Sequence, residues 1–292
     1  MQQKNFEKHL RIAILLTFIF FVVEIVGGFI SGSLSLLGDA GHMLRDMFAL
    51  VISLSALNIS KKLPSKRKTL GFHRVEIFAG FLNGILLIAV AIWILLEAYQ
   101  RFHSPKPIES TTMFIIALIG MGINLYLAFK LHGSHDLNIK SAFLHILTDA
   151  AFSFAVVLAA GLIFLTGNTI FDPLLSSIIS VAIILSASKL VKESIMILLE
   201  FTPKDVDFDL VLKDIQQVDG VEGVHNVHIW SLCSNINVMD AHVYTKETDM
   251  IKIEKIKNKI KKKLVKYNIK HVTLEFECEE CILLNRVERI EH

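Results

Sequence analysis

The chain has 292 residues, and 53% of them are hydrophobic. Its mean hydropathy of +0.54 is higher than that of an ordinary soluble domain. With 15 glycines and 5 prolines, the composition excludes a fibrous or low-complexity protein. The net charge of +2 at pH 7 gives no reason to expect a nucleic-acid partner. All three cysteines lie after residue 232, and this odd number does not make a complete disulfide framework.

Six apolar segments are long enough to cross a membrane as helices, since about 20 residues span the hydrocarbon core. They lie at about 10–30, 35–59, 76–100, 111–131, 141–166 and 173–199. The first follows a basic N-terminus and could instead be a signal peptide. It has no A-x-A-like cleavage site, and a second apolar segment follows it, so we expect a retained spanning helix. The sequence therefore predicts an α-helical membrane protein with six transmembrane helices.

Lysine and arginine residues are unequally divided between the two sides of these segments. The N-terminus and the connectors after the second and fourth segments carry 11 of them. The other three connectors carry only Arg101 and Lys106. Because positively charged connectors stay on the cytoplasmic side, we expect both termini in the cytoplasm.

After Pro203 the sequence becomes polar, and its apolar residues follow short helical and alternating patterns. These patterns predict helices at about 208–215 and 253–264, and strands at about 224–232, 237–245 and 271–277. The order αββαβ suggests a small ferredoxin-like α+β domain. We therefore expect a transmembrane domain at residues 1–202 and a cytoplasmic domain at residues 203–292. Nine lysines between residues 252 and 270 either meet anionic membrane lipid or form a solvated helix face.

Two apolar segments contain the same His-x-x-x-Asp motif: His42 and Asp46 in the second, and His145 and Asp149 in the fifth. Residues four apart lie on one face of a helix. Such side chains cost about 2.5–3.5 kcal/mol at the bilayer centre, so each needs a partner. Two facing motifs offer two imidazole nitrogens and two carboxylate oxygens, which suits tetrahedral Zn²⁺, with Co²⁺ or Cd²⁺ as competitors. The alternative is that each motif is only a hydrogen bond in helix packing.

Further ionisable residues lie within the apolar segments, among them Glu24, Asp39, Arg45 and Glu97. Arg45 either pairs with Glu24 or turns toward lipid headgroups. Asp39, one turn before His42, either hydrates the path of the ion or caps the start of its helix. Glu97, near the outer end of the third segment, is expected to be solvated.

Several motifs together resemble one protein family. They are GSLSLLGDAGHMLRD at 32–46, AFLHILTDA at 142–150, Phe171-Asp172-Pro173 and HNVHIWSL at 225–232. They resemble the cation diffusion facilitators, especially the CzcD-type and animal zinc-transporter branch, over the chain to about residue 277. The resemblance implies a homodimeric metal/proton antiporter with six spanning helices and a cytoplasmic metallochaperone-like domain. It places both His-x-x-x-Asp motifs at the transport site, and the histidine at position 42 resembles the zinc-preferring branch.

The resemblance also implies metal ligands in the polar domain. It matches four positions that bind metal ions between two protomers, although His and Asp are usual at the last two: His225, His242, Glu275 and Glu277. Cys278 and Cys281 form a C-x-x-C pair, which fills only half of a tetrahedral zinc site. The resemblance further implies an ion pair between Arg74 and Glu200. Because a long His-rich loop is absent, it favours a bacterial plasma (inner) membrane.

Three functions from different classes fit a metal-binding membrane protein. A secondary transporter uses the protons that metal ligands release on binding. A zinc hydrolase needs an open coordination position and a general base, as in H-E-x-x-H, and the sequence lacks this motif. A metal sensor needs an output domain, and none is recognisable after residue 277. We therefore expect a secondary active transporter, not an enzyme, that exports Zn²⁺ in exchange for protons and needs no cofactor.

Overall fold

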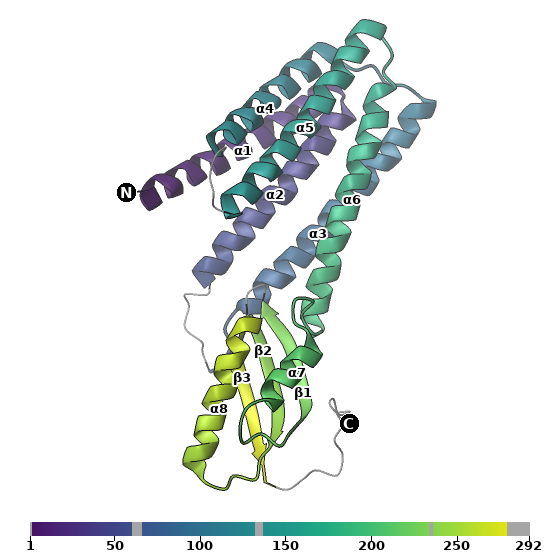
Figure 1. Cartoon of the computed structure of the whole chain (residues 1–292). Helices are drawn as coiled ribbons and strands as arrows, with labels where there is room; N and C mark the ends of the chain where they lie inside the picture. Colours follow the sequence, from purple (N-terminus) through teal and green to yellow (C-terminus); the bar gives the residue numbers. More distant parts are fainter. Residues whose placement is uncertain (1, 60–65, 132–136, 234–235, 279–292) are drawn as a thin grey trace. The chain divides into compact units, whose positions relative to one another are not determined.

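The computed structural model describes residues 2–59, 66–131, 137–233 and 236–278. Within these ranges, six long helices are followed by a smaller α/β region (Figure 1). The long helices are α1 (Gln2–Ser31), α2 (Leu34–Ile59), α3 (His73–His103), α4 (Ser110–Leu131), α5 (Leu137–Thr166) and α6 (Phe171–Leu198). Each overlaps one of the six predicted apolar segments, so the predicted positions of these helices are confirmed.

Three helical spans in the described part of the chain are long and apolar enough to cross a membrane. They are α3, α6 and the stretch Ile146–Thr166 of α5, with mean hydropathies of 2.5, 2.1 and 2.1. Two shorter apolar stretches are Thr17–Ser31 in α1 and Ser110–Tyr126 in α4. Large apolar side chains lie exposed on the helices, as expected of a surface that contacts lipid. The chain is therefore a multi-pass membrane protein, whereas the crossing of all six helices stays a prediction.

The described residues divide into two compact units. The first comprises Met1–Leu54 and Leu82–Val191. Its largest core cluster takes buried side chains from five helices, including Leu36, Leu87, Met113, Val156 and Ile179. Helices α1 and α4 pack together, and any side chain at Gly120 would overlap the ring of Phe20. A small residue at this crossing lets the two backbones approach, as is common between membrane helices.

A carboxylate from α6 caps the start of α2. Asp172 is fully buried and accepts hydrogen bonds from the backbone amides of Leu34 at 2.8 Å and Ser35 at 3.0 Å. The hydroxyls of Ser33 and Ser35 donate to the same carboxylate at 2.6 and 2.7 Å. Arg101 of α3 adds a positive charge 3.6 Å away. Because the first amides of a helix have no partner within it, this carboxylate satisfies them and fixes α2 against α6.

The second unit comprises Ser55–Phe81 and Lys192–His292. It contains α7 (Phe208–Gln216), β1 (Gly223–Cys233), β2 (Ile236–Tyr244), α8 (Met250–Leu264) and β3 (Ile269–Glu277). The predicted order αββαβ is confirmed. The strands follow the order β1-β2-β3, with β1 and β2 antiparallel and β2 and β3 parallel. The sheet is thus small and mixed, and the ferredoxin-like assignment stays a prediction.

Both helices of this α/β region are amphipathic, and they bury their apolar residues against the sheet. Ile256, Ile260 and Leu264 lie four residues apart on α8 and are buried, together with Ile215 of α7 and Met239 of β2. Each helix starts at an aspartate cap. The side chains of Asp207 and Asp249 accept hydrogen bonds from backbone amides in the first turns of α7 and α8. This region therefore has its own hydrophobic core.

Candidate metal centres

The first candidate centre lies between α2 and α5. His42 Nδ1 is 3.7 Å from Asp149 Oδ1, although the two residues are more than 100 positions apart in the sequence. His42 is 6% exposed, and its ring packs against Phe152 with centroids 5.1 Å apart. The histidine of one His-x-x-x-Asp motif thus lies beside the aspartate of the other, as two facing motifs require.

The other two motif residues are Asp46 and His145. They lie on the same helices at i+4 from His42 and i−4 from Asp149, which puts them on the same faces. Their side chains fall outside the described part of the structure. The four-ligand cage therefore stays a prediction, of which the structure describes one half.

A second polar contact joins the same two helices one turn away. Ser153 Oγ donates a hydrogen bond to Asp39 Oδ2 at 3.1 Å, and both residues are buried. Of the two alternatives for Asp39, the helix cap is wrong, because α2 begins at Leu34 and Asp172 supplies the cap, and the role in hydrating the path of the ion stays a prediction. Glu24 of α1 is buried next to Asp39. The predicted choice for Arg45, between Glu24 and lipid, falls on a side chain outside the described residues.

A charged cluster lies near the end of α3. Glu97 accepts hydrogen bonds from Arg101 Nε at 3.2 Å and from Lys106 Nζ at 2.6 Å, and its side chain is only 17% exposed. The expectation that Glu97 is simply solvated is therefore wrong. The cause is local: Arg101 follows Glu97 by four residues on α3, which places the two side chains on one helix face.

The second candidate centre lies on one face of the sheet. His225 of β1 is in register with His242 of β2, which in turn is in register with Glu275 of β3. Glu277 lies two residues further along β3, on the same face as Glu275. Strand register therefore gathers all four residues that the sequence indicated, although they come from three separate strands.

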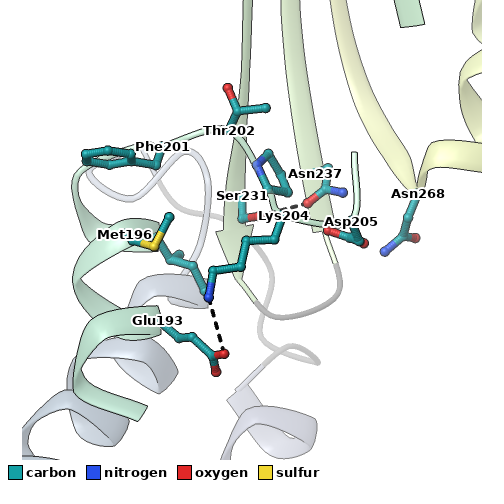
Figure 2. A pocket seen from close by; sticks show the side chains of 11 residues that line it. Glu193, Met196, Phe201, Thr202, Lys204, Asp205, Ser231, Asn237 and Asn268 are labelled. Carbon is teal, nitrogen blue, oxygen red and sulfur yellow. Dashed lines mark hydrogen bonds and ion pairs between the residues drawn. The ribbon is translucent and has the colours of Figure 1, made fainter. Parts of the chain in front are cut away.

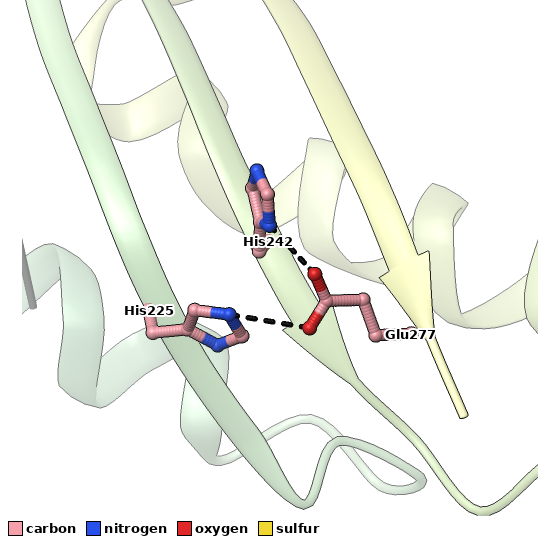
Figure 3. A group of neighbouring side chains, drawn as sticks. All are labelled: His225, His242 and Glu277. Carbon is pink, nitrogen blue, oxygen red and sulfur yellow. Dashed lines mark hydrogen bonds and ion pairs between the residues drawn. The ribbon is translucent and has the colours of Figure 1, made fainter. Parts of the chain in front are cut away.

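Three of these side chains converge, as Figure 3 shows. Glu277 lies between the two imidazoles, with His242 Nδ1 2.7 Å from Oε1 and His225 Nε2 3.2 Å from Oε2. One ligand atom of each lies within 4.8 Å of the others. Glu275 is more peripheral: its Oε2 is 3.6 Å from His242 Nε2, and its side chain is 69% exposed. Two nitrogens and a carboxylate oxygen are a donor set that zinc accepts, with a further position left for another ligand.

The sequence did not point to Asn226, which supports this cluster. Its Nδ2 lies 3.4 Å from His242 Nε2, and its Oδ1 lies 2.9 Å from His228 Nε2. Asn226 has a φ of 46°, and the pairing of β1 with β2 shifts register between His225 and His228. Asparagine tolerates this left-handed conformation better than most residues, so it suits the irregular position. Only its place between two histidines hinted at this role.

The remaining predicted ligands are the two cysteines. Cys278 is exposed, and its Sγ lies 3.9 Å from the backbone oxygen of Glu247. Cys281 falls outside the described residues. The C-x-x-C pair as a metal site therefore stays a prediction.

Two further features belong to the second unit. Arg74 donates a hydrogen bond to Glu200, so the ion pair predicted from the resemblance is confirmed. A cavity of about 320 Å³ lies beside the end of α6. Figure 2 shows its lining side chains, among which Lys204 Nζ lies 3.6 Å from Glu193 Oε1. Its described lining contains neither histidine nor cysteine, so it is not a candidate for a transition-metal site.

Comparison with known proteins covers nearly the whole chain. A family model described as the cation efflux transmembrane domain matches residues 10–199. A second, described as the cytoplasmic domain of cation efflux proteins, matches residues 203–279. Both matches span elements that carry the candidate centres.

Curated relatives are similar over most of their length. The metal cation efflux system protein CzcD of Cupriavidus metallidurans is 39% identical over 278 residues, which is 94% of this chain and 88% of that protein. The zinc transporter ZitB of Escherichia coli is 38% identical over 270 residues, 90% of this chain and 84% of that protein. The cadmium, cobalt and zinc/H(+)-K(+) antiporter of Bacillus subtilis is 36% identical over 265 residues, 89% of this chain and 85% of that protein.

Proposed function

The chain belongs to the cation efflux family, the cation diffusion facilitators, and we propose that it exports Zn²⁺ from the cytoplasm in exchange for protons. Membership makes it a membrane transporter of metal cations and not an enzyme. The relatives' names include zinc, cadmium and cobalt, and zinc is the cargo common to the transporters named for specific metals. Cd²⁺ and Co²⁺ are the alternative cargoes.

One observation carries the proposal: His42 and Asp149, from different motifs, lie 3.7 Å apart between α2 and α5. A histidine and a carboxylate buried between apolar helices are costly unless they bind something. With Asp46 and His145 on the same helix faces, the expected site has two nitrogens and two oxygens around one Zn²⁺. This donor set contains no sulfur, which suits zinc in a site that must release it.

Proton exchange follows from the chemistry of these ligands. Histidine and carboxylate side chains bind zinc only when deprotonated, so zinc loading releases protons. Protonation from the other side of the membrane then ejects the ion. A structural zinc affinity of about 10–16 kcal/mol would trap the ion. We therefore expect micromolar binding, about 8 kcal/mol.

The proposal includes an arrangement for the whole protein. All six long helices cross the plasma (inner) membrane, both termini are cytoplasmic, and residues 1–202 and 203–292 are the transport and cytoplasmic domains. The cytoplasmic domain is ferredoxin-like and pairs with a second copy to form a homodimer. Its cluster of His225, His242 and Glu277 binds Zn²⁺, with Glu275, Cys278 and Cys281 as additional ligands. A hundredfold preference of zinc for the tighter dimer would supply about 2.7 kcal/mol.

Zinc flux into liposomes that contain the purified chain tests the function. A pH gradient should drive zinc movement by the wild type. Asp149→Asn should reduce this flux more than about a hundredfold, because even an outer-shell partner of a metal ligand is worth about 10–100-fold.

The matched control is Thr148→Val, at the neighbouring position of α5, where the side chain is exposed. It should transport zinc like the wild type. Zinc flux by Asp149→Asn at the wild-type rate would exclude the site, and a wild type that moves no zinc would exclude the function.

A further inference from the structure

Glu24 is a buried acid that the zinc site does not use. It is fully buried on α1, and neither of its side-chain oxygens has a hydrogen-bond donor. Its carboxyl group faces that of Asp39 on α2, which is also buried. A buried charge is costly unless a cation or a hydrogen bond compensates it. Among the described residues, no cation and no hydrogen-bond donor compensates Glu24.

The acidic pair lies close to the zinc site but is separate from it. Along the contact of α2 with α5, His42 lies by Asp149, and one turn further Ser153 donates to Asp39. Glu24 lies beside Asp39, in the second of these two contacts. Among the described residues, the group of Glu24, Asp39 and Ser153 contains no histidine or cysteine. Zinc would therefore prefer the site with His42 over this group.

A single proton satisfies this pair. Two carboxylates that face each other in a buried site cannot both be ionised. The hydroxyl of Ser153 donates to Asp39, whereas neither oxygen of Glu24 has a donor, so a proton on Glu24 would supply the hydrogen-bond donor that the pair lacks. Among the described residues, the other titratable groups near this pair are His42 on α2 and Asp149 on α5. A divalent cation held by His42 and Asp149 would favour loss of this proton, because it attracts the negative charge that the proton leaves behind.

We propose that Glu24 and Asp39 form a proton site, distinct from the zinc ligands, that empties when zinc binds one helical turn away. On emptying, the O–H bond of Glu24 breaks, the proton passes to water, and two carboxylates remain beside the bound cation. The inference rests on the proposed zinc/proton exchange. It adds a residue on α1 to the coupling, which the two His-x-x-x-Asp motifs alone do not include.

The ratio of protons to zinc ions tests the site. Liposomes containing the full chain trap a pH indicator and a zinc indicator, and both fluxes are recorded together. Glu24→Gln keeps the shape and a hydrogen-bond donor of the acid but has no proton to release. It should lower the ratio by about one proton per zinc ion. The matched control Glu109→Gln, at an exposed glutamate before α4, should keep the wild-type ratio.

Two outcomes would overturn the site. One is a wild-type ratio in Glu24→Gln. The other is K⁺ dependence: if replacing K⁺ by choline slows zinc flux in the wild type but not in Glu24→Gln, and the proton ratio is unchanged, the pair holds K⁺ and not a proton. Failure of the proposed function is distinguishable, because then the wild type itself moves no zinc.

Infrared spectroscopy of the wild-type protein gives a second readout that needs neither transport nor a folded variant. The C=O stretching band of a protonated carboxylic acid should be present near neutral pH and should decrease when zinc is added. Absence of a zinc-sensitive acid band would overturn the proposal. Where Glu24→Gln folds, it should lack this band.

Discussion

Histidines and carboxylates lie close together in two regions of the described structure, and the contacts that they make differ between the two. On the sheet, Glu277 lies 2.7 and 3.2 Å from the imidazole nitrogens of His242 and His225. The carboxylate is thus already hydrogen-bonded to His242 and within ion-pair distance of His225, the two groups that would share a metal with it. Between the membrane helices, His42 and Asp149 are 3.7 Å apart, and a second pair consists of two acids, Glu24 and Asp39.

The difference determines what a cation gains at each place. A metal ion on the sheet must displace protons that its ligands hold between them, so part of its binding energy replaces existing hydrogen bonds. A cation between the helices offsets the negative charge of acids that lie among apolar helices. Under the proposed function, we therefore expect the sheet to hold a resident ion that responds to metal supply and the helices to hold an ion in transit.

The largest effect is expected from a third kind of carboxylate, whose hydrogen-bond donors all come from the protein itself. Asp172→Ala removes the acceptor of four hydrogen bonds at the start of α2. Since each buried donor left unpaired costs about 1–3 kcal/mol, we expect a loss of more than about 3 kcal/mol in stability. Thermal unfolding in detergent measures it. The control Glu109→Gln should stay within about 0.5 kcal/mol of the wild type, and an equally stable Asp172→Ala would show that the cap is not what fixes α2.

An intermediate effect is expected on the sheet. The double variant His225→Ala/His242→Ala in the full chain should bind about one zinc ion fewer per chain, because it removes both nitrogen ligands. Zinc should still move across the membrane, in contrast to Asp149→Asn. Equilibrium dialysis and flux assays measure the two quantities. His271→Ala, at an exposed histidine on β3, is the matched control. Unchanged zinc content in the double variant would exclude the cluster as a metal site.

The smallest effect is expected from an acid in the second unit that takes no part in metal binding. Hydrogen bonds from Lys266 and then Tyr267 lower the pKa of Asp214 below its ordinary value of 3.8. A lowered pKa in the folded state stabilises above the unfolded pKa, and this stabilisation is lost as the pH falls through the folded value. Because the side chain of Lys266 is 56% exposed, solvent weakens its ion pair with Asp214 and the effect is small.

Acid unfolding of the second unit measures this effect. The fluorescence of Trp230 reports the unfolding in a chain that also carries Trp93→Phe. Below about pH 4, the region where an ordinary aspartate titrates, the stability of the wild type should fall more steeply than that of Asp214→Asn. Parallel pH profiles would show that the contacts of Asp214 with Lys266 and Tyr267 add nothing to folding.

Local patterns were sufficient to predict much of this structure from the sequence. The length of the apolar runs placed six helices, apolar periodicity placed two shorter helices and three strands, and the spacing of His42 with Asp46 placed both on one helix face. Partners from distant segments were harder to predict. The cap on α2 comes from Asp172, about 138 positions away, so Asp39 was the nearer but wrong candidate.

The sheet cluster shows the same limit. Nothing in the sequence fixes the register that puts His225 opposite His242, and only the family resemblance brought these residues together before the structure did. The irregular pairing at Asn226 depends on a backbone conformation that a single asparagine permits but does not require.

The coordination of zinc in a chain that lacks the sheet cluster tests the account most directly. The His225→Ala/His242→Ala variant, loaded with one zinc ion per chain, is examined by X-ray absorption at the zinc edge. The account predicts four nitrogen or oxygen ligands at about 2.0–2.2 Å, and loss of this spectrum when Asp149→Asn is added. A sulfur ligand at about 2.3 Å, or a spectrum that Asp149→Asn leaves unchanged, would contradict a zinc site between α2 and α5.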